Sequence, residues 1–403
     1  MGPPTADLYF ASEVTAMSRA GTLRNYHEVE RGMASGPQVR VNGKSCLTFC
    51  CQDYLGLSRH PAMLEAMREA VDRYGCGMAG SRFIGGTSPL HHQAERALAA
   101  LHDGEAAVLY ANGYMANLGS IAALAKPGDV IFSDELNHAS IIDGCRLSRS
   151  EIVVWRHNDV EDLRLRLQQY PSAGNRFVIC ESLYSMEGHF APVREVLSAC
   201  AEFGCFAYVD EIHAVGVYGP KGDGYAAQLG LSSQVDLLMA GAGKALGSLG
   251  GYVVTRSDPA ALLKSRSRAF IFTTALPPAI VSTVITATEL VVDAGLLRRR
   301  ILENARTLRS WLREADFDCM TSESHIVPIL TGSSETTGRV TQHLLADGLY
   351  AQGVTYPSVP RDRGRLRIAV TADHTLDDLD RLVSGLKKVR NQVASFPRHR
   401  STE

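Results

Sequence analysis

The stretch RFVICESLYSMEGHFAPVREVLSACAEFGCFAYVDEIH, residues 176–213, contains the pattern that decides the fold. Residues 176–180 are an apolar strand, residues 193–203 have the spacing of a helix, and residues 206–209 are a second apolar strand. This order is typical of a β-α-β crossover, whose two strands are parallel and bind ligands at their carboxyl ends. We therefore expect an α/β fold with a mostly parallel sheet.

Similar patterns lie on both sides of this stretch. An amphipathic helix is expected at 62–74. Short apolar strands are expected at 103–110, 129–132, 151–155 and 236–239. Beyond about residue 290 the pattern changes to alternating helices and short strands, at 296–315, 325–330, 338–347, 365–370 and 376–391. We expect an N-terminal arm over 1–50, a large domain over 51–290 and a smaller C-terminal α+β domain over 291–403.

Composition excludes several classes of protein. The chain has 403 residues, is 45% hydrophobic and carries 41 Lys+Arg against 43 Asp+Glu, which excludes disorder and gives no electrostatic case for nucleic acid. Prolines, hydroxyl residues and Glu289 interrupt the apolar stretch 276–292, so we expect no membrane span. Nine scattered cysteines without a C-x-x-C pair, and no signal pattern in residues 1–16, favour a cytoplasmic protein without disulfides or zinc.

Two glycine-rich stretches resemble nucleotide-binding motifs without meeting their requirements. Residues 75–80, GCGMAG, match G-x-G-x-x-G, but a helix precedes them where the dinucleotide motif needs a strand. Residues 241–245, GAGKA, have Ala245 where a P-loop needs the hydroxyl that binds magnesium. The first stretch is better explained as a loop lining a site, and the second leaves Lys244 among small residues.

Lys244 is either a surface lysine on a flexible loop or a confined nucleophile with a lowered pKa. Neighbouring strand ends favour the second interpretation, because Ser185, Asp210 and His213 each follow a predicted strand. Each alone has an ordinary explanation, such as a capping Asp or a buried His. Together at one edge of the sheet they match pyridoxal 5′-phosphate, whose ring nitrogen pairs with an Asp and whose aldehyde forms an imine with a Lys.

Two further loops suit the same cofactor. Gly113 and Tyr114 stand where a strand passes into a helix, so their backbone N–H groups can hold a phosphate. His138 also follows a strand and can lie over the cofactor ring, although an exposed polar loop would explain it equally well.

Seven motifs show a wider resemblance over about residues 20–390. They are D53-YLGL, S81-RFIGGT, L136-NHAS, Y184-SMEG, V209-DEIHAVG, G243-KA and R365-LR. These motifs resemble those of the α-oxoamine synthases, pyridoxal-phosphate enzymes with the aspartate-aminotransferase fold (fold type I). Members include 5-aminolevulinate synthase, 2-amino-3-ketobutyrate CoA ligase, 8-amino-7-oxononanoate synthase and serine palmitoyltransferase.

The resemblance implies a cofactor site and a role for each residue in it. Lys244 would form the Schiff base, Asp210 would pair with the ring nitrogen, and His138 would stack on the ring. The remaining cofactor contacts would be made by His213 and Ser185 at the ring hydroxyl, Gly113 and Tyr114 at the phosphate, and Thr274 at the phosphate of a neighbouring subunit. A homodimer with shared active sites is therefore implied.

The implied reaction joins a small amino acid (glycine, alanine or serine) to an acyl thioester and releases CoA and carbon dioxide, giving an α-aminoketone. Arg367 would grip the amino acid carboxylate. Two positions depart from the family: Gly241 replaces a threonine that contacts phosphate, and Gln52 replaces an asparagine near the amino acid carboxylate. Transamination on the same fold, or a non-catalytic subunit of a synthase, are the other hypotheses.

The acyl donor is harder to predict. Residues 210–219, 324–328 and 356–361 resemble 5-aminolevulinate synthase. By that resemblance, Arg24 and Ser358 of this chain would stand where that enzyme binds the carboxylate of its acyl group. That enzyme has Asn where this chain has Phe83, and Ser81 with Phe83 looks more like the ketobutyrate ligase or serine palmitoyltransferase. We expect a sister enzyme of specialised metabolism, with 5-aminolevulinate synthase proper and an acyl-carrier-protein-dependent synthase as alternatives.

Overall fold

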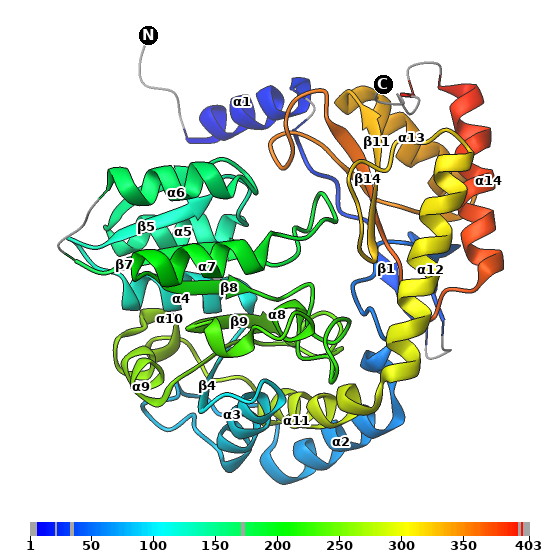
Figure 1. Ribbon diagram of the computed structural model, residues 1–403. Coiled ribbons are helices and arrows are strands. Elements are labelled where there is room, and N and C mark those ends of the chain that lie inside the picture. The colour runs from blue at the N-terminus through cyan, green and yellow to red at the C-terminus, as the bar shows by residue number, and fades with distance from the viewer. Residues whose placement is uncertain (1–5, 21, 33–35, 171–173, 394–395, 398–403) are drawn as a thin grey trace. The chain divides into compact units, whose positions relative to one another are not determined.

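The computed structural model describes residues 6–20, 22–32, 36–170, 174–393 and 396–397. Its contacts divide the chain into two units (Figure 1). The larger unit contains residues 52–302, and the smaller contains residues 1–51 together with 303–403.

The larger unit is built on one sheet of strand order β4-β10-β9-β8-β7-β5-β6. Its strands are β4 (Ala106–Tyr110), β5 (Val130–Asp134), β6 (Glu151–Trp155), β7 (Arg176–Glu181), β8 (Phe206–Asp210), β9 (Leu237–Gly241) and β10 (Gly251–Thr255). Only β10 runs against its neighbours, since it pairs antiparallel with both β4 and β9 in the described residues. The carboxyl ends of the other strands therefore meet at one edge.

Helices cover both faces of this sheet, which explains why its strands are continuous apolar runs. On one face Val178 and Val209 pack with α6 (Val160–Gln169) and α7 (Val193–Phe203). On the other face Ile179 and Tyr208 pack with α4 (Gly113–Leu124), α5 (Ala139–Ser148), α9 (Ser257–Arg266) and α10 (Arg268–Ile271). The remaining helices of the unit are η1 (Leu57–Arg59), α2 (Pro61–Tyr74), α3 (Pro89–Leu101), α8 (Tyr225–Gln228), η2 (Ser232–Gln234) and α11 (Pro278–Asp293).

The smaller unit is α+β. One sheet has the order β1-β2-β3-β12, from β1 (Val29–Glu30), β2 (Gln38–Val41), β3 (Lys44–Thr48) and β12 (Leu349–Tyr350). A second has the order β11-β14-β13, from β11 (Ile326–Gly332), β13 (Gly353–Val354) and β14 (Gly364–Ala369). Its helices are α1 (Ala6–Arg19), α13 (Ser334–Ala346) and α14 (Leu376–Gln392), and α12 (Gly295–Glu314) runs across the boundary at residue 302.

The fold class expected from the sequence is confirmed, with a mostly parallel sheet and a C-terminal α+β unit. The structure groups the segment 1–50 differently from the expected separate arm. β3 pairs in parallel with β12, so this segment belongs to the same unit as the C-terminal residues. Among the described residues no single helix is long and apolar enough to cross a membrane, and by length and composition alone only α11 and α12 together pass, as a pair bent by 75°.

Candidate active site

The candidate residues of the larger unit follow the carboxyl ends of its strands. β8 ends at Asp210, and the turn after β9 carries Lys244. His138 lies beyond the end of β5, and Gly113 begins the helix after β4. Asp210 and His138 lie close enough to shift each other's pKa, and the charge of Lys244 affects both. The structure therefore brings together three residues that the sequence placed separately.

Asp210 is only 3% exposed. Burial raises the pKa of its carboxyl group, while hydrogen bonds and the nearby His138 and Lys244 lower it. Asn117 Nδ2 donates to Oδ2 at 2.8 Å, and the backbone N–H of Ile212 donates to Oδ1 at 2.9 Å. A buried carboxylate that retains acceptor capacity suits a protonated ring nitrogen.

His138 caps the N-terminus of α5. Its Nδ1 accepts from the backbone N–H of Ser140 at 3.2 Å and lies 2.7 Å from Ser140 Oγ. Its own backbone N–H donates to Glu181 Oε1 at 2.7 Å. Burial lowers the pKa of the imidazole, Asp210 raises it and Lys244 lowers it, with a net fall. The ring is therefore neutral at pH 7.

Lys244 is half-buried, and its Nζ donates to Gln52 Oε1. Gln52, predicted to lie near the amino acid carboxylate, is thus placed at the lysine itself. The hydroxyl of Tyr54 lies 2.8 Å from Nδ1 of the buried His213. Tyr54 belongs to a motif noted in the sequence, but its contact with His213 could not be read from that motif.

The start of α4 is closely packed at Gly113, where a side chain would require Ile212 to shift. An added Cβ there would lie 2.6 Å from Ile212 Cδ1, and one at Gly241 would lie 2.8 Å from the same atom. The family's threonine is therefore replaced by Gly241 at a position where Ile212 fills the space. Asn112 caps the helix by accepting from the backbone N–H of Met115 at 2.9 Å, which leaves a helix N-terminus suited to a phosphate.

Two further predicted residues, Tyr114 and Ser185, also lie on the larger unit. The Tyr114 hydroxyl donates to Asp143, and its ring stands edge-on to His138 with centroids 6.2 Å apart. Ser185 is half-buried in the turn after β7. The buried Asp210, the half-buried Lys244 and the N-terminus of α4 together fit pyridoxal phosphate.

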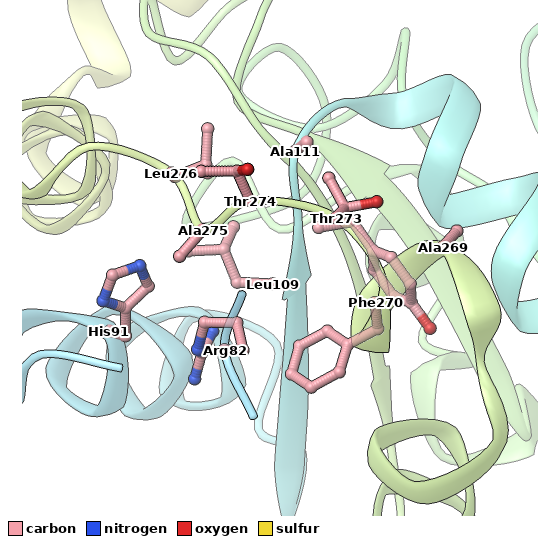
Figure 2. A pocket seen from close by; sticks show the side chains of 11 residues that line it. Arg82, His91, Leu109, Ala111, Ala269, Phe270, Thr273, Thr274, Ala275 and Leu276 are labelled. Atoms are coloured by element: carbon pink, nitrogen blue, oxygen red, sulfur yellow. The ribbon is translucent and has the colours of Figure 1, made fainter. Parts of the chain in front are cut away.

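Ser81 and Thr274 are brought together by an antiparallel bridge. Thr274 also lines a hollow of about 10 Å³ with Arg82 and Phe270 (Figure 2), a space no larger than one water molecule. Phe83, which follows Arg82 in the chain, is 78% exposed. Within this chain Phe83 therefore lines no closed pocket.

The remaining predicted residues belong to the smaller unit. Arg24 donates from an Nη atom to Ser358 Oγ at 2.8 Å, so these two predicted neighbours are in contact. Arg24 borders a hollow of about 530 Å³ that is also lined by Tyr26 and Tyr356. Arg367 is buried in β14, with its backbone N–H on Gln352 O at 3.2 Å.

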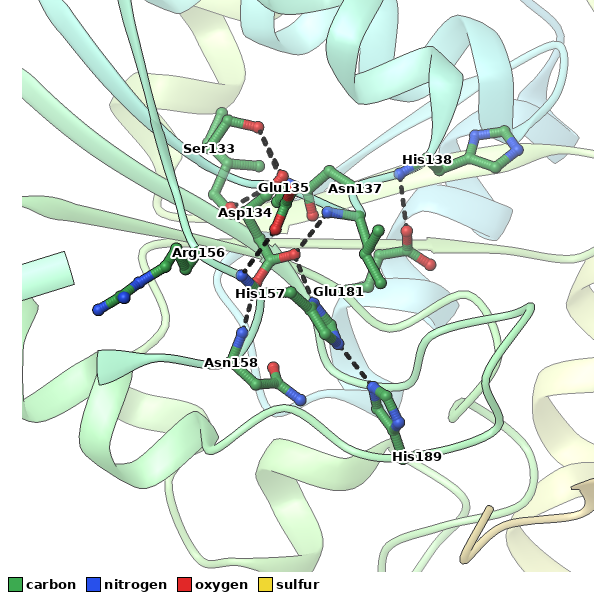
Figure 3. A network of polar contacts seen from close by, with 12 residues as sticks. Ser133, Asp134, Glu135, Asn137, His138, Arg156, His157, Asn158, Glu181 and His189 are labelled. Carbon is green, nitrogen blue, oxygen red and sulfur yellow. Dashed lines mark hydrogen bonds and ion pairs between the residues drawn. The ribbon is translucent and has the colours of Figure 1, made fainter. Parts of the chain in front are cut away.

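Figure 3 shows the His138–Glu181 hydrogen bond and a further set of polar contacts around Asp134. Asp134 Oδ1 lies 2.7 Å from His157 Nδ1, and His157 Nε2 lies 2.6 Å from His189 Nε2. Burial lowers the pKa of His189 to about 4, so this ring is neutral. The described residues contain no group of three or more His, Cys, Asp or Glu able to hold a metal ion.

Comparison with known proteins gives a consistent result. Residues 44–386 match the family model for aminotransferase class I and II. The chain is 39% identical to 8-amino-7-oxononanoate synthase of Geobacter sulfurreducens, over 95% of this chain and 98% of the relative. It is 36% identical to 5-aminolevulinate synthase of Rhizobium meliloti, over 96% of this chain and 97% of the relative.

Solved structures agree with these relatives. The serine palmitoyltransferase of Sphingomonas wittichii superposes with a TM-score of 0.91 at 30% identity, over 97% of this chain and 98% of that one. A structure of SPT with the PLP internal aldimine gives a TM-score of 0.90 at 31% identity, over 96% and 98%. The chain therefore belongs to the aminotransferase class I and II family and, within it, to the α-oxoamine synthases, which are pyridoxal-phosphate-dependent acyltransferases.

Proposed function

We propose that this protein condenses a small amino acid (glycine, alanine or serine) with an acyl thioester, with loss of carbon dioxide and release of an α-aminoketone. The observation that carries the proposal is the convergence of Asp210, His138 and Lys244 beside the start of α4. Acyl-CoA is the thioester we favour, and CoA is then the leaving group. The scattered cysteines agree with a cytoplasmic location.

Bound pyridoxal phosphate supplies an aldehyde and an electron-accepting ring. Lys244 Nζ would be the nucleophile for that aldehyde and, as a free amine, would accept the α-proton of the amino acid. Asp210 would hold negative charge at the ring nitrogen, and His138 would contact the ring. His213 and Ser185 orient the ring hydroxyl.

Other residues anchor the phosphate and the substrates in this proposal. Gly113 and Tyr114 hold the phosphate, with Thr274 of a neighbouring subunit, so the active unit is a homodimer. Arg367 binds the amino acid carboxylate through a two-pronged hydrogen bond. Because Gln52 accepts from Lys244, it also sets the position of the amine.

The acyl group is the least determined part of the proposal. Beside Ser81, the exposed Phe83 offers an apolar surface, whereas Arg24 and Ser358 offer a polar one. A succinyl group, as used in 5-aminolevulinate synthesis, needs the second. An aliphatic acyl group, delivered by CoA or by a carrier protein, needs the first. We favour an aliphatic acyl group, because Phe83 stands where 5-aminolevulinate synthase has a polar Asn.

The test is the visible absorption band of the bound cofactor, followed with glycine, alanine and serine, each with and without a panel of acyl-CoAs. We expect one amino acid to shift the band, and one acyl-CoA to release free thiol and carbon dioxide in equal amounts. Lys244→Ala should abolish the covalent cofactor band, whereas exposed Lys126→Ala should leave it unchanged.

Two outcomes would change the proposal. Cofactor binding with amino group transfer and no need for a thioester would replace it with transamination. A normal band without thiol release from any acyl-CoA would direct the same assay to acyl-carrier-protein thioesters.

The shared site has its own test. Lys244→Ala and Thr274→Tyr protomers are mixed and refolded together, and turnover is measured. If each site takes Thr274 from the partner, the hybrid dimers recover one intact site. No recovery would mean that each chain builds its site alone.

A further inference from the structure

Asn117 is a buried amide at the centre of the site, 1% exposed, and no role was expected for it. Its Nδ2 donates to Asp210 Oδ2 at 2.8 Å and to Ser140 Oγ at 3.0 Å. Its Oδ1 accepts from the Tyr208 hydroxyl at 2.8 Å. One amide group therefore touches the partner of the ring nitrogen and the residue that holds His138.

The chemistry of these partners fixes which way the amide points. An ionised carboxylate only accepts hydrogen bonds, so the amide nitrogen must face Asp210. The amide oxygen then faces Tyr208, whose buried hydroxyl has a pKa raised by desolvation and keeps its proton. Ser120 Oγ lies 2.8 Å from the same hydroxyl and completes the chain.

A second arm of the network reaches His138. The backbone N–H of Ser140 donates to His138 Nδ1, so this nitrogen carries no proton when the ring is neutral. Ser140 Oγ can then accept from Asn117 and donate to His138 Nδ1, 2.7 Å away. The single proton of the neutral ring is therefore on Nε2.

We propose that Asn117 is a positioning residue, which holds the Asp210 carboxylate and, through Ser140, the His138 imidazole in the arrangement that the cofactor ring requires. The inference rests on the proposed cofactor contacts of these two residues, and it is independent of the thioester. Charge-assisted hydrogen bonds are the strong ones in a buried site, so the Asn117–Asp210 bond is the larger contribution.

The test replaces Asn117 by leucine and measures the unfolding of the cofactor-free protein against pH. Asn117 stabilises the ionised form of Asp210, so its loss raises the pKa of Asp210 further. A folded-state pKa above the unfolded value costs stability as pH rises. The stability gap between wild type and Asn117→Leu should widen once pH rises above the folded-state pKa of Asp210 in the wild type, which burial places above the ordinary value of about 4.

One background and one control variant make this result specific. Asp210 faces the ionisable groups of His138, Lys244, Glu181, Glu211 and Tyr208, which stay the same in the comparison. In an Asp210→Asn background the widening should vanish. Asn304, a buried amide whose Nδ2 contacts only backbone carbonyls among its described contacts, is the matched control. Asn304→Leu should lose stability equally at every pH.

Cofactor affinity is the second readout. Asn117→Leu should raise the dissociation constant for pyridoxal phosphate about ten- to hundredfold, the range for a hydrogen bond to a charged group. Tyr208→Phe leaves Asp210 untouched and frees the amide oxygen, so it should act in the same direction more weakly. It keeps the test possible if Asn117→Leu does not fold.

A stability loss that is constant with pH, with cofactor affinity unchanged, would overturn the inference and reduce Asn117 to a packing residue. A protein that binds the cofactor as expected and condenses no thioester would instead overturn the proposed function, and would leave the role of Asn117 intact.

Discussion

Asp210 and Glu211 are consecutive residues with different surroundings. Both are buried, at 3% and 0% exposure, and burial raises the pKa of both carboxyl groups. Glu211 accepts from Ser182 Oγ at 2.8 Å and from the backbone N–H groups of Tyr225 and Ala226 at 2.9 and 2.8 Å. These neutral donors tie it to the first turn of α8.

Asp210 has fewer hydrogen bonds from the chain and different electrostatic neighbours. Its pKa is lowered by Asn117 and Ile212, and also by His138 and Lys244. Two carboxylates on one strand end thus have opposite environments. Glu211 is satisfied by the protein alone, whereas Asp210 keeps capacity for a charged partner. We infer that Glu211 serves the fold and Asp210 serves the chemistry.

The largest expected effect is on turnover. Asp210→Asn replaces the charge at the ring nitrogen by a neutral amide of equal size, so kcat should fall by about 10²–10³-fold, as for other electrostatic contacts to a reacting group. Its unfolding midpoint in urea should not fall. Full turnover in this variant would end the distinction between the two carboxylates.

Glu211→Ala should act on stability instead. It leaves buried donors of Ser182, Tyr225 and Ala226 without an acceptor, at about 1–3 kcal/mol each, so the free energy of unfolding should fall by about 3 kcal/mol or more. Unfolding in urea measures this change in the free energy of unfolding. Glu65→Ala, at an exposed pair with Arg68, should change it by less than about 0.5 kcal/mol. A stable Glu211→Ala protein with lost cofactor binding would reverse our assignment.

The pH dependence of stability separates the two residues further. Because burial raises the pKa of Asp210, its contribution to stability is full below the unfolded pKa and is lost as pH rises towards the folded value. Without cofactor, the stability of Asp210→Asn relative to wild type should therefore increase from about pH 4 upward. Thermal unfolding at a series of pH values shows this, and parallel curves would contradict it.

The next residue, Ile212, gives the smallest expected effect. Gly241→Thr alone should weaken cofactor binding, because its Cβ would meet Ile212 Cδ1 at 2.8 Å. Ile212→Ala should restore part of the loss, about tenfold or less. Fluorescence titration of the cofactor across the double-mutant cycle measures the coupling. Additive effects would show that Gly241 and Ile212 are independent.

Local pattern predicted much of this molecule. The unit β7-α7-β8 follows from two apolar runs and one helical spacing. Asp210 was found because it stands at the end of a strand, and Lys244 because it lies in the turn beyond one. The partnership of Asn117 with Asp210 was not predictable, because a single polar residue inside an apolar helix has no distinguishing pattern. The roles of the site residues remain predictions.

Long-range pairing was also beyond the sequence. The strand β3 joins β12 about 300 residues later, and nothing in either short strand identifies the other. The space that Ile212 occupies at Gly241 is likewise a three-dimensional fact. Sequence could report the departure from the family at Gly241, but not its cause.

The reversed strand β10 has a consequence for protein synthesis. β4 lies at the edge of the sheet, and its partner there is β10, which follows only after residues 111–250. At roughly 5–20 residues per second, the ribosome needs about ten to thirty seconds to supply that partner. During this time the nascent chain carries an unpaired apolar strand. We expect chains released near residue 250 to aggregate or to need a chaperone, and those released beyond residue 302 to be less prone to it, which sedimentation of translation products stalled at each length would show.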